Sequence, residues 1–283
     1  MKWVAPRRQR LISFLQERVG ERASARRIKR ALESNLCRVN GRIERFASSE
    51  IDRGAVIELA SRWDEKPQTK PQFSVLFEDS SILAVAKPVG WSCNEENARA
   101  SFGSQAHLVH RLDKDTTGAL LLAKNKEAKN ALEKLFAERE MEKEYLALVD
   151  RQVSSKEGVQ KSNLSKIGSF EGQTIWGSRS GGLFAETAWE CLAHGTEASL
   201  MLCKPFTGRT HQIRVHMAEM GHPILIDRQY ARSFRCPEFF QRPLLHAARL
   251  SFVHPFTNER LDLKAPLPED FLSALKLLKI DRL

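Results

Sequence analysis

The N-terminal part of the chain alternates short amphipathic stretches with turn signals. Apolar residues recur at helical spacing over residues 10–19 and again over residues 25–33, where Ser24 is positioned to cap the second helix. Asn40-Gly41 between two short apolar runs is a tight-turn signal, and a strand is expected over residues 55–59. The pattern predicts two helices, a hairpin and a final strand in one compact unit.

After a polar segment the pattern becomes strand-rich. Strands are expected at residues 73–77, 82–86, 144–149, 187–191 and 199–203, and helices at residues 126–138 and 210–220, the last capped by Thr210. Residues 151–183 are rich in Ser and Gly and are expected to form an irregular insertion on the substrate side. Hairpins with a few long helices indicate an α+β domain around a mainly antiparallel, mixed sheet.

The polar segment over residues 61–72 contains two prolines and no periodicity, so it is expected to be a linker. This division predicts a small α/β domain at residues 1–60 and a larger α+β domain at residues 73–283.

Composition narrows the class of protein. The 283 residues are 42% hydrophobic and 28% charged, as in soluble globular proteins. Five scattered cysteines without a Cys-x-x-Cys pair argue against a disulfide framework and a zinc ribbon. The N-terminus lacks the apolar core of a signal peptide, and no run reaches the roughly 18 apolar residues of a membrane span. We expect a cytoplasmic monomer without a membrane partner.

Positive charge is concentrated near the N-terminus. Residues 1–62 carry 15 basic and 7 acidic residues, whereas the rest carries 30 and 28. On the second predicted helix a cationic face projects away from the apolar stripe; it consists of Arg26, Arg27, Lys29 and Arg30. A basic tail without a partner and attraction to anionic lipid are alternatives, but the segment lacks an exposed apolar face for lipid. A nucleic acid is therefore the expected partner.

The densest charge cluster of the chain runs from His110 to Gly118 and leads into an apolar strand. It places two carboxylates, two cations and a histidine within six residues. Burying such charges at the start of a strand costs free energy unless they form ion pairs or take part in chemistry. A solvated turn between two strands is the alternative interpretation.

Five ordered segments together resemble the motifs of the RluA-type pseudouridine synthases. They are residues 79–90, 110–125, 143–148, 207–224, and a C-terminal group at 244–247, 252–255 and 265–268. Residues 10–60 resemble, in the order of their elements, the small RNA-binding module of the ribosomal-protein S-four type. The resemblance implies an RNA-binding domain followed by a catalytic domain that isomerises uridine.

The resemblance also implies roles for individual residues. Asp113 is the expected catalytic carboxylate, with Arg214 as its ion-pair partner and Tyr145 stacked on the base. A surface cation and an ordinary core tyrosine are the alternatives for Arg214 and Tyr145. The target uridine must leave its stack, and Arg111 resembles the family arginine that fills the vacated space, phosphate contact being the alternative.

An apolar wall over the base is assigned to Leu244 or Leu245, for which ordinary core positions are the alternative. No cofactor is expected because the isomerisation is redox-neutral. No metal site is expected, since His211 and His216 are five residues apart and do not share a helix face. The chain departs from the family at Ile226, where a glycine is usual, and we expect Ile to exclude a backbone conformation that glycine adopts easily.

The expected activity is that of an RNA pseudouridine synthase, an isomerase, acting on 23S-type ribosomal RNA, with a transfer RNA target as the alternative. A catalytically idle RNA-binding or ribosome-assembly protein is a rival, which intact Asp113, Tyr145 and Arg214 argue against. A metal-dependent nuclease would need carboxylates and histidines clustered at ligand spacing, which the sequence lacks.

Overall fold

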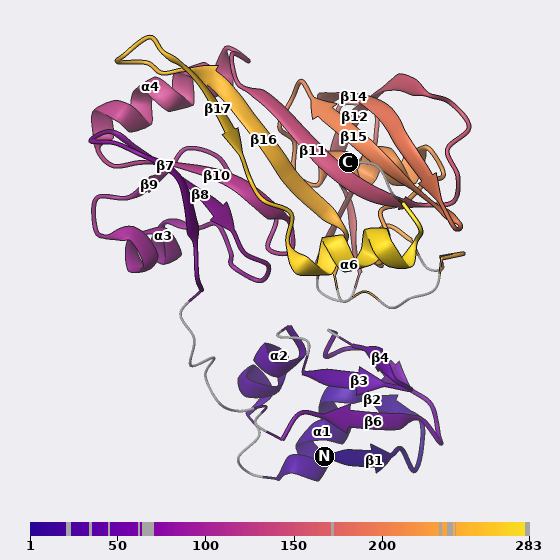
Figure 1. Cartoon of the computed structure of the whole chain (residues 1–283). Helices are drawn as coiled ribbons and strands as arrows, with labels where there is room; N and C mark the ends of the chain where they lie inside the picture. Colours follow the sequence, from indigo (N-terminus) through magenta and orange to yellow (C-terminus); the bar gives the residue numbers. More distant parts are fainter. Residues whose placement is uncertain are drawn as a thin grey trace. The chain divides into compact units, whose positions relative to one another are not determined.

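The computed structural model describes residues 1–20, 24–33, 36–44, 46–61, 63, 71–170, 173–231, 234–236, 240 and 242–280. The chain divides into two compact units (Figure 1). One comprises Met1–Lys70 and Gly168–Ile175, and the other comprises Pro71–Ile167 and Trp176–Leu283. Most of the predicted linker, residues 62 and 64–70, lies outside the described residues.

The N-terminal unit contains the two predicted helices, α1 (Leu11–Val19) and α2 (Ala25–Glu33). They accompany a four-stranded sheet in the order β1-β6-β3-β4 and a pair β2-β5. The strands are β1 (Lys2–Val4), β2 (Gln9–Arg10), β3 (Cys37–Val39), β4 (Arg42–Ile43), β5 (Glu50–Ile51) and β6 (Val56–Leu59). The Ser24 hydroxyl accepts a 3.3 Å bond from the Arg27 N–H, which confirms the predicted cap of α2.

A large mixed sheet carries the second unit, in the order β13-β12-β14-β15-β11-β16-β10-β8-β7, with β17 beside β16 and β9 beside β10. Its strands are β7 (Ser74–Glu78), β8 (Ile82–Lys87), β9 (His107–Leu108), β10 (Thr117–Ala123), β11 (Glu142–Asp150), β12 (Glu157–Phe170), β13 (Gln173–Ser178), β14 (Leu183–Gly195), β15 (Ala198–Pro205), β16 (Leu245–Val253) and β17 (Arg260–Lys264). The register pairs β10 with β16 in parallel, whereas β10–β8 and β11–β15 are antiparallel. The predicted α+β class with a mainly antiparallel sheet is confirmed.

Helices cover both faces of this sheet. Along β8, side chains alternate between two hydrophobic clusters, so that Ala84 packs toward α4 (Lys126–Ala137) and Val85 toward α3 (Glu95–Phe102). Along β11, Ala147 belongs to the cluster of α5 (Gln212–Glu219), and Leu148 to the cluster of α6 (Glu269–Leu277). Strand alternation thus fixes the place of each helix. Among the described residues no helix is long and apolar enough to cross a membrane.

Two local predictions were wrong. Residues 151–183 are not an irregular insertion but contain the long strands β12 and β13. The covered face of the first half of β12 consists of Gly158, Gln160, Ser162 and Leu164, so a single large apolar side chain is all that marks the alternation by which a strand is detected. One of its glycines is a packing residue, because a Cβ at Gly158 would lie 2.5 Å from the Trp189 ring.

The second error concerns the start of α5. The cap is His211 rather than Thr210, and His211 holds a left-handed conformation with φ 57° and no capping side-chain bond. Ser and Thr are favoured caps, but the backbone here is set by contacts of His211 described below.

Candidate active site

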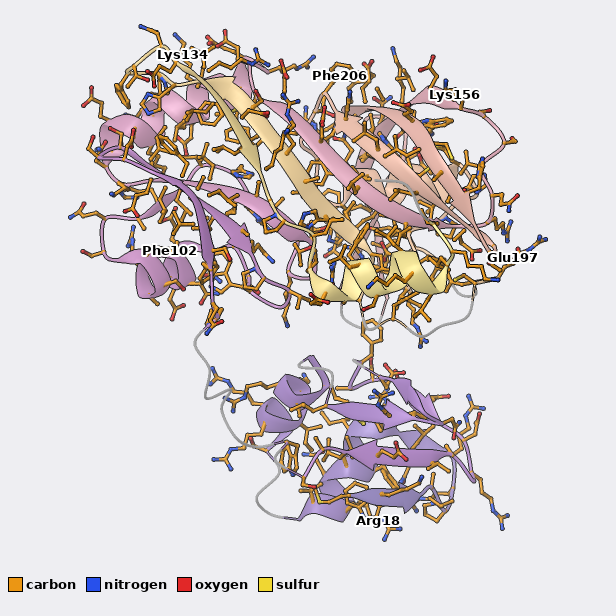
Figure 2. All side chains as sticks on the ribbon, viewed as in Figure 1. Arg18, Phe102, Lys134, Lys156, Glu197 and Phe206 are labelled. Atoms are coloured by element: carbon orange, nitrogen blue, oxygen red, sulfur yellow. The ribbon has the colours of Figure 1, made fainter. Side chains whose placement is uncertain are left out.

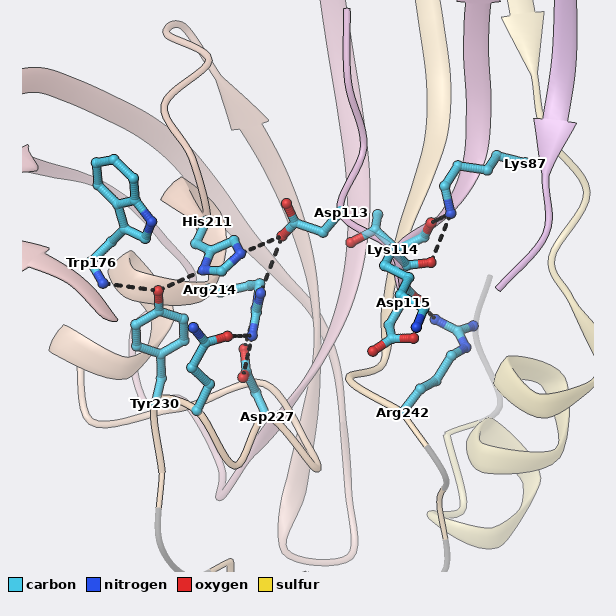
Figure 3. A network of polar contacts seen from close by, with 12 residues as sticks. Lys87, Asp113, Lys114, Asp115, Trp176, His211, Arg214, Asp227, Tyr230 and Arg242 are labelled. Carbon is cyan, nitrogen blue, oxygen red and sulfur yellow. Dashed lines mark hydrogen bonds and ion pairs between the residues drawn. The ribbon is translucent and has the colours of Figure 1, made fainter. Parts of the chain in front are cut away.

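Asp113 lies in the loop between β9 and β10, and two buried cations hold the backbone of that loop (Figure 3). Lys87, at the end of β8, is 1% exposed and donates to the carbonyl oxygens of Pro88, Lys114 and Thr116 at 2.9–3.0 Å. Burial lowers the pKa of Lys87 to about 8. A buried ammonium persists only when its protons are all used, so the three carbonyls explain the position of Lys87.

Arg242 holds the other side of the same loop. Its Nη1 donates to the carbonyl oxygens of Asp115 and Leu245 at 3.1 Å, and its Nη2 donates to the Thr117 hydroxyl at 3.3 Å. The guanidinium also makes a bidentate pair with Asp270 of α6. The loop of Asp113 is therefore tied to β8, to the start of β16 and to α6.

Gly118 is required where this loop enters β10. Its φ is +116°, and a Cβ there would lie 2.1 Å from the carbonyl oxygen of Ala247 on the parallel neighbour β16. Any other residue would push the two strands apart at the base of the loop.

Arg214, from the middle of α5, contacts Asp113 as the family resemblance implies. Its Nη1 lies 3.3 Å from Asp113 Oδ2, while Nε and Nη2 bind the two oxygens of Asp227 at 2.6 and 2.7 Å. Nη2 also donates to Gln229 at 2.7 Å. The nearby carboxylates raise the pKa of Arg214 against the opposing effect of burial. Arg214 is thus a fixed cation that orients Asp113, and Asp227 and Gln229 fix Arg214.

His211 and Tyr230 complete the same network, and the sequence analysis did not anticipate this pair. The Tyr230 hydroxyl accepts from the Trp176 backbone N–H at 3.3 Å and lies 2.7 Å from His211 Nδ1. The other ring nitrogen, Nε2, faces the Asp113 carboxylate. That nitrogen is 3.8 Å from Asp113 Oδ2. Burial and the charge of Arg214 lower the pKa of His211, so the neutral form faces Asp113.

The backbone that presents Asp227 departs from expectation. Ile226 adopts φ 66°, in the left-handed region, so the prediction that Ile excludes this conformation was wrong. The conformation is strained for a β-branched residue. It persists because the flanking segment is held, with Asp227 bound to Arg214 and the Leu225 N–H bonded to the Leu148 carbonyl at 2.9 Å.

A cleft of about 540 Å³ opens over these groups, and its lining contains Arg111, Asp113, Tyr145, Arg214 and Leu245. Burial, followed by the charge of Asp113, raises the pKa of Tyr145, which is therefore a neutral phenol near pH 7. Arg111 is exposed. The structure brings together every predicted site residue of this domain except Leu244.

Leu244 lies in the hydrophobic cluster that packs around Phe271 and is fully buried. It does not belong to the lining of the cleft. Of the two leucines offered for the apolar wall, only Leu245 is in position. Successive residues at the start of a strand point to opposite faces, which separates the two.

The histidines considered as metal ligands have other partners. His216 is buried, with its ring nitrogens 3.0 and 2.9 Å from the hydroxyls of Ser162 and Thr187. Within the described ranges, no three His, Cys, Asp or Glu residues gather in a group that could hold a metal ion.

In the N-terminal unit, α2 exposes the predicted cationic face. Arg26, Arg27, Lys29 and Arg30 are exposed, while Ile28, Ala31 and Leu32 are buried. The side chains of this face are therefore available to a polyanion without a change in the core of the unit.

Comparisons with known proteins show the family of the chain. A family model described as RNA pseudouridylate synthase matches residues 82–219. Ribosomal large subunit pseudouridine synthase D of Pasteurella multocida is 30% identical over 288 residues, which cover 91% of this chain and 88% of that protein. Ribosomal large subunit pseudouridine synthase C of Escherichia coli is 36% identical over 223 residues, covering 72% and 70%.

Two solved human structures share the fold. RNA pseudouridylate synthase domain containing 1 superposes with a TM-score of 0.59 at 26% identity, covering 77% of this chain and 99% of that chain. RNA pseudouridylate synthase domain containing 4 has a TM-score of 0.60 at 24% identity, covering 72% and 92%. With the fold, the site and the relatives in agreement, the chain belongs to the RluA-type RNA pseudouridine synthases, a family of isomerases.

Proposed function

We propose that this protein converts uridine to pseudouridine in ribosomal RNA, with Asp113 as the catalytic carboxylate. The observation that supports this most is the placement of Asp113 in the cleft, 3.3 Å from an arginine that is itself fixed by Asp227. A carboxylate held in this way can act at the anomeric carbon of a nucleotide extruded into the cleft.

The reaction conserves all atoms. The bond between C1′ and N1 breaks, the uracil turns, C5 bonds to C1′, the proton on C5 leaves to solvent, and N1 takes up a proton from solvent. The sugar passes through an oxocarbenium-like state, which a nearby carboxylate stabilises either by attack at C1′ or as a base at the sugar. No electron acceptor or group donor enters this balance.

The other residues of the cleft fit supporting roles. Tyr145 stays uncharged and can pack on the uracil, and Leu245 offers an apolar wall beside it. Arg111 is exposed at the cleft and can fill the space left by the extruded base, which offsets part of the few kcal/mol that extrusion costs.

The N-terminal unit, which we propose to be an S-four-like RNA-binding domain over residues 1–60, supplies a second contact through its cationic face on α2. Two relatives are named as ribosomal large subunit enzymes, which favours 23S-type RNA over a transfer RNA. Such a substrate agrees with the cytoplasmic location expected from the cysteine usage.

The substrate is tested by tritium release from RNA labelled at uridine C5. The full-length protein should release tritium from a 23S-type ribosomal transcript and not from transfer RNA. A metal chelator should not change this release. Release from transfer RNA alone would overturn the ribosomal assignment, and release from neither would favour an idle RNA-binding protein.

A further inference from the structure

The cleft is lined by five cationic side chains and a single carboxylate, although the second unit as a whole is nearly neutral. The cations are Arg111, Arg139, Lys143, Arg209 and Arg214, and the carboxylate is Asp113. Arg214 is held by Asp113 and Asp227. The other four form no ion pair with a carboxylate in the part of the chain that the structure describes. An excess of cations without internal partners favours an anionic ligand along the rim.

Two of these cations, Arg139 and Lys143, line the cleft together, and the charge of Arg139 acts on Lys143. Lys143 precedes Tyr145 by two residues on β11 and so shares its face of the sheet. Its Nζ donates to the Thr207 carbonyl oxygen at 3.4 Å. Burial and then the charge of Arg139 lower the pKa of Lys143 to about 8. Two cations that line one cleft and form no ion pair within the described residues are suited to share a phosphate.

An exposed aromatic residue adjoins this pair. Phe206 follows the end of β15, lines the cleft and is 52% exposed. Its backbone is fixed, because its N–H bonds to the Glu186 carbonyl oxygen at 2.9 Å and the next hydroxyl, of Thr207, bonds to Gln212 at 2.6 Å. Figure 2 shows Phe206 at the outer surface of the second unit. A rigidly held, exposed ring beside cations is a stacking platform for a nucleic-acid base.

We propose that Phe206, Arg139 and Lys143 form a subsite for an unpaired nucleotide that flanks the target uridine. Phe206 stacks on the base of that nucleotide, and Arg139 with Lys143 binds its phosphate. The subsite rests on the proposed function, since its nucleotide is the neighbour of the one extruded toward Asp113. The subsite would make the enzyme prefer RNA in which the nucleotide beside the target is unpaired. Asp113 and Arg214 cannot provide this preference.

The stacking half of the subsite is tested with Phe206→Ala, and with Phe206→Trp as the variant that keeps an aromatic ring. The probe is a 23S-type transcript on which the wild type releases tritium. Phe206→Ala should weaken RNA binding and lower kcat/KM by about tenfold, since base stacking is worth about 1–3 kcal/mol. Phe206→Trp should keep wild-type values. Phe256→Ala, which removes a 42% exposed phenylalanine outside the cleft, is the matched control and should change neither.

An abasic nucleotide beside the mapped target separates stacking from a general loss of structure. The wild type should bind the abasic RNA as weakly as Phe206→Ala binds intact RNA, and Phe206→Ala should lose nothing further on it. If Phe206→Ala lost as much affinity on the abasic RNA as the wild type does, the stacking proposal would be overturned. Wild-type affinity of Phe206→Ala for intact RNA would also overturn it.

The phosphate half is tested through salt. Lys143→Gln should reduce the slope of log K against log salt by about 0.7–0.9, while Lys143→Arg and the exposed control Lys126→Gln keep it. An unchanged slope in Lys143→Gln would overturn this contact. If the wild type released no tritium from any RNA, the proposed function itself would fail. If the wild type were active and its subsite variants behaved like it, only the subsite would fail.

Discussion

At the scale of single residues, Arg214 decides the geometry of the site. One guanidinium contacts Asp113 through Nη1 and holds Asp227 with its two remaining nitrogens. Asp227 follows Ile226, whose left-handed conformation aims the carboxylate at Arg214. A strained residue next to a site ligand is typical of functional positions, where the surroundings enforce the conformation.

Replacement of Ile226 tests this strain. Both Ile226→Ala and Ile226→Gly remove the partly buried side chain, but only glycine adopts φ 66° without steric cost. We expect Ile226→Gly to be more stable than Ile226→Ala by about 1 kcal/mol, measured by urea unfolding. Equal stability of the two variants, or a more stable alanine, would show that Ile226 is not strained.

The residues of the site differed in how far sequence could predict them. The pairing of Asp113 with Arg214 followed from the family motif, and the structure shows it. Tyr230 was missed because it bonds to His211, 19 residues away, through a turn that no periodicity reveals. The sequence did contain a signal for this pair, because His211 lies in the same motif as Arg214. The sequence analysis considered His211 only as a metal ligand.

At the scale of elements, the loop from Asp113 to Thr117 owes its form to distant strands and a helix. Lys87 supplies three donors from the end of β8, and Arg242 supplies donors while bound to Asp270 of α6. Residues 113–117 carry no apolar side chain, so these polar anchors determine the conformation of the loop.

Loss of the Lys87 anchor should therefore disturb the loop. In Lys87→Met the carbonyl oxygens of Pro88, Lys114 and Thr116 lose their donor in a buried site. We expect a loss of about 2–4 kcal/mol in the free energy of unfolding and a lower kcat. The matched control is Lys124→Met, since Lys124 also donates to a carbonyl oxygen, that of Asp79, but is one-third exposed. A control as destabilised as Lys87→Met would contradict this assignment.

Elements with clear periodicity were predicted, and those without it were not. The helix α4 carries an apolar stripe, and the strands β8 and β11 are apolar runs. By contrast, β12 is stabilised by its pairing with β14, whose residues are 19 to 33 positions away, rather than by an apolar pattern of its own. Long-range pairing of this kind leaves no local signal.

At the scale of the whole molecule, each of the two units has a cationic surface. The helix α2 presents four exposed cations, and the cleft of the second unit is lined by five cations and one carboxylate. Both surfaces suit a polyanion. In our proposal, one RNA binds both surfaces.

The contribution of α2 is measured by salt dependence. Exchange of Arg26, Arg27, Lys29 and Arg30 for glutamine should weaken binding to ribosomal RNA and lower the salt slope by about 0.7–0.9 for each phosphate that is no longer neutralised. The stability should hardly change, because all four side chains are exposed. Wild-type affinity and slope in the fourfold variant would remove α2 from RNA binding.

The most direct test of the account is single-turnover tritium release from C5-labelled ribosomal RNA by wild type, Asp113→Asn and the control Asp262→Asn. Asp262 is an exposed carboxylate on β17 that pairs with Arg249. The rate should fall by on the order of 10⁴ in Asp113→Asn, with RNA affinity retained, and stay at the wild-type value in the control. Undiminished release by Asp113→Asn would contradict the catalytic role of Asp113.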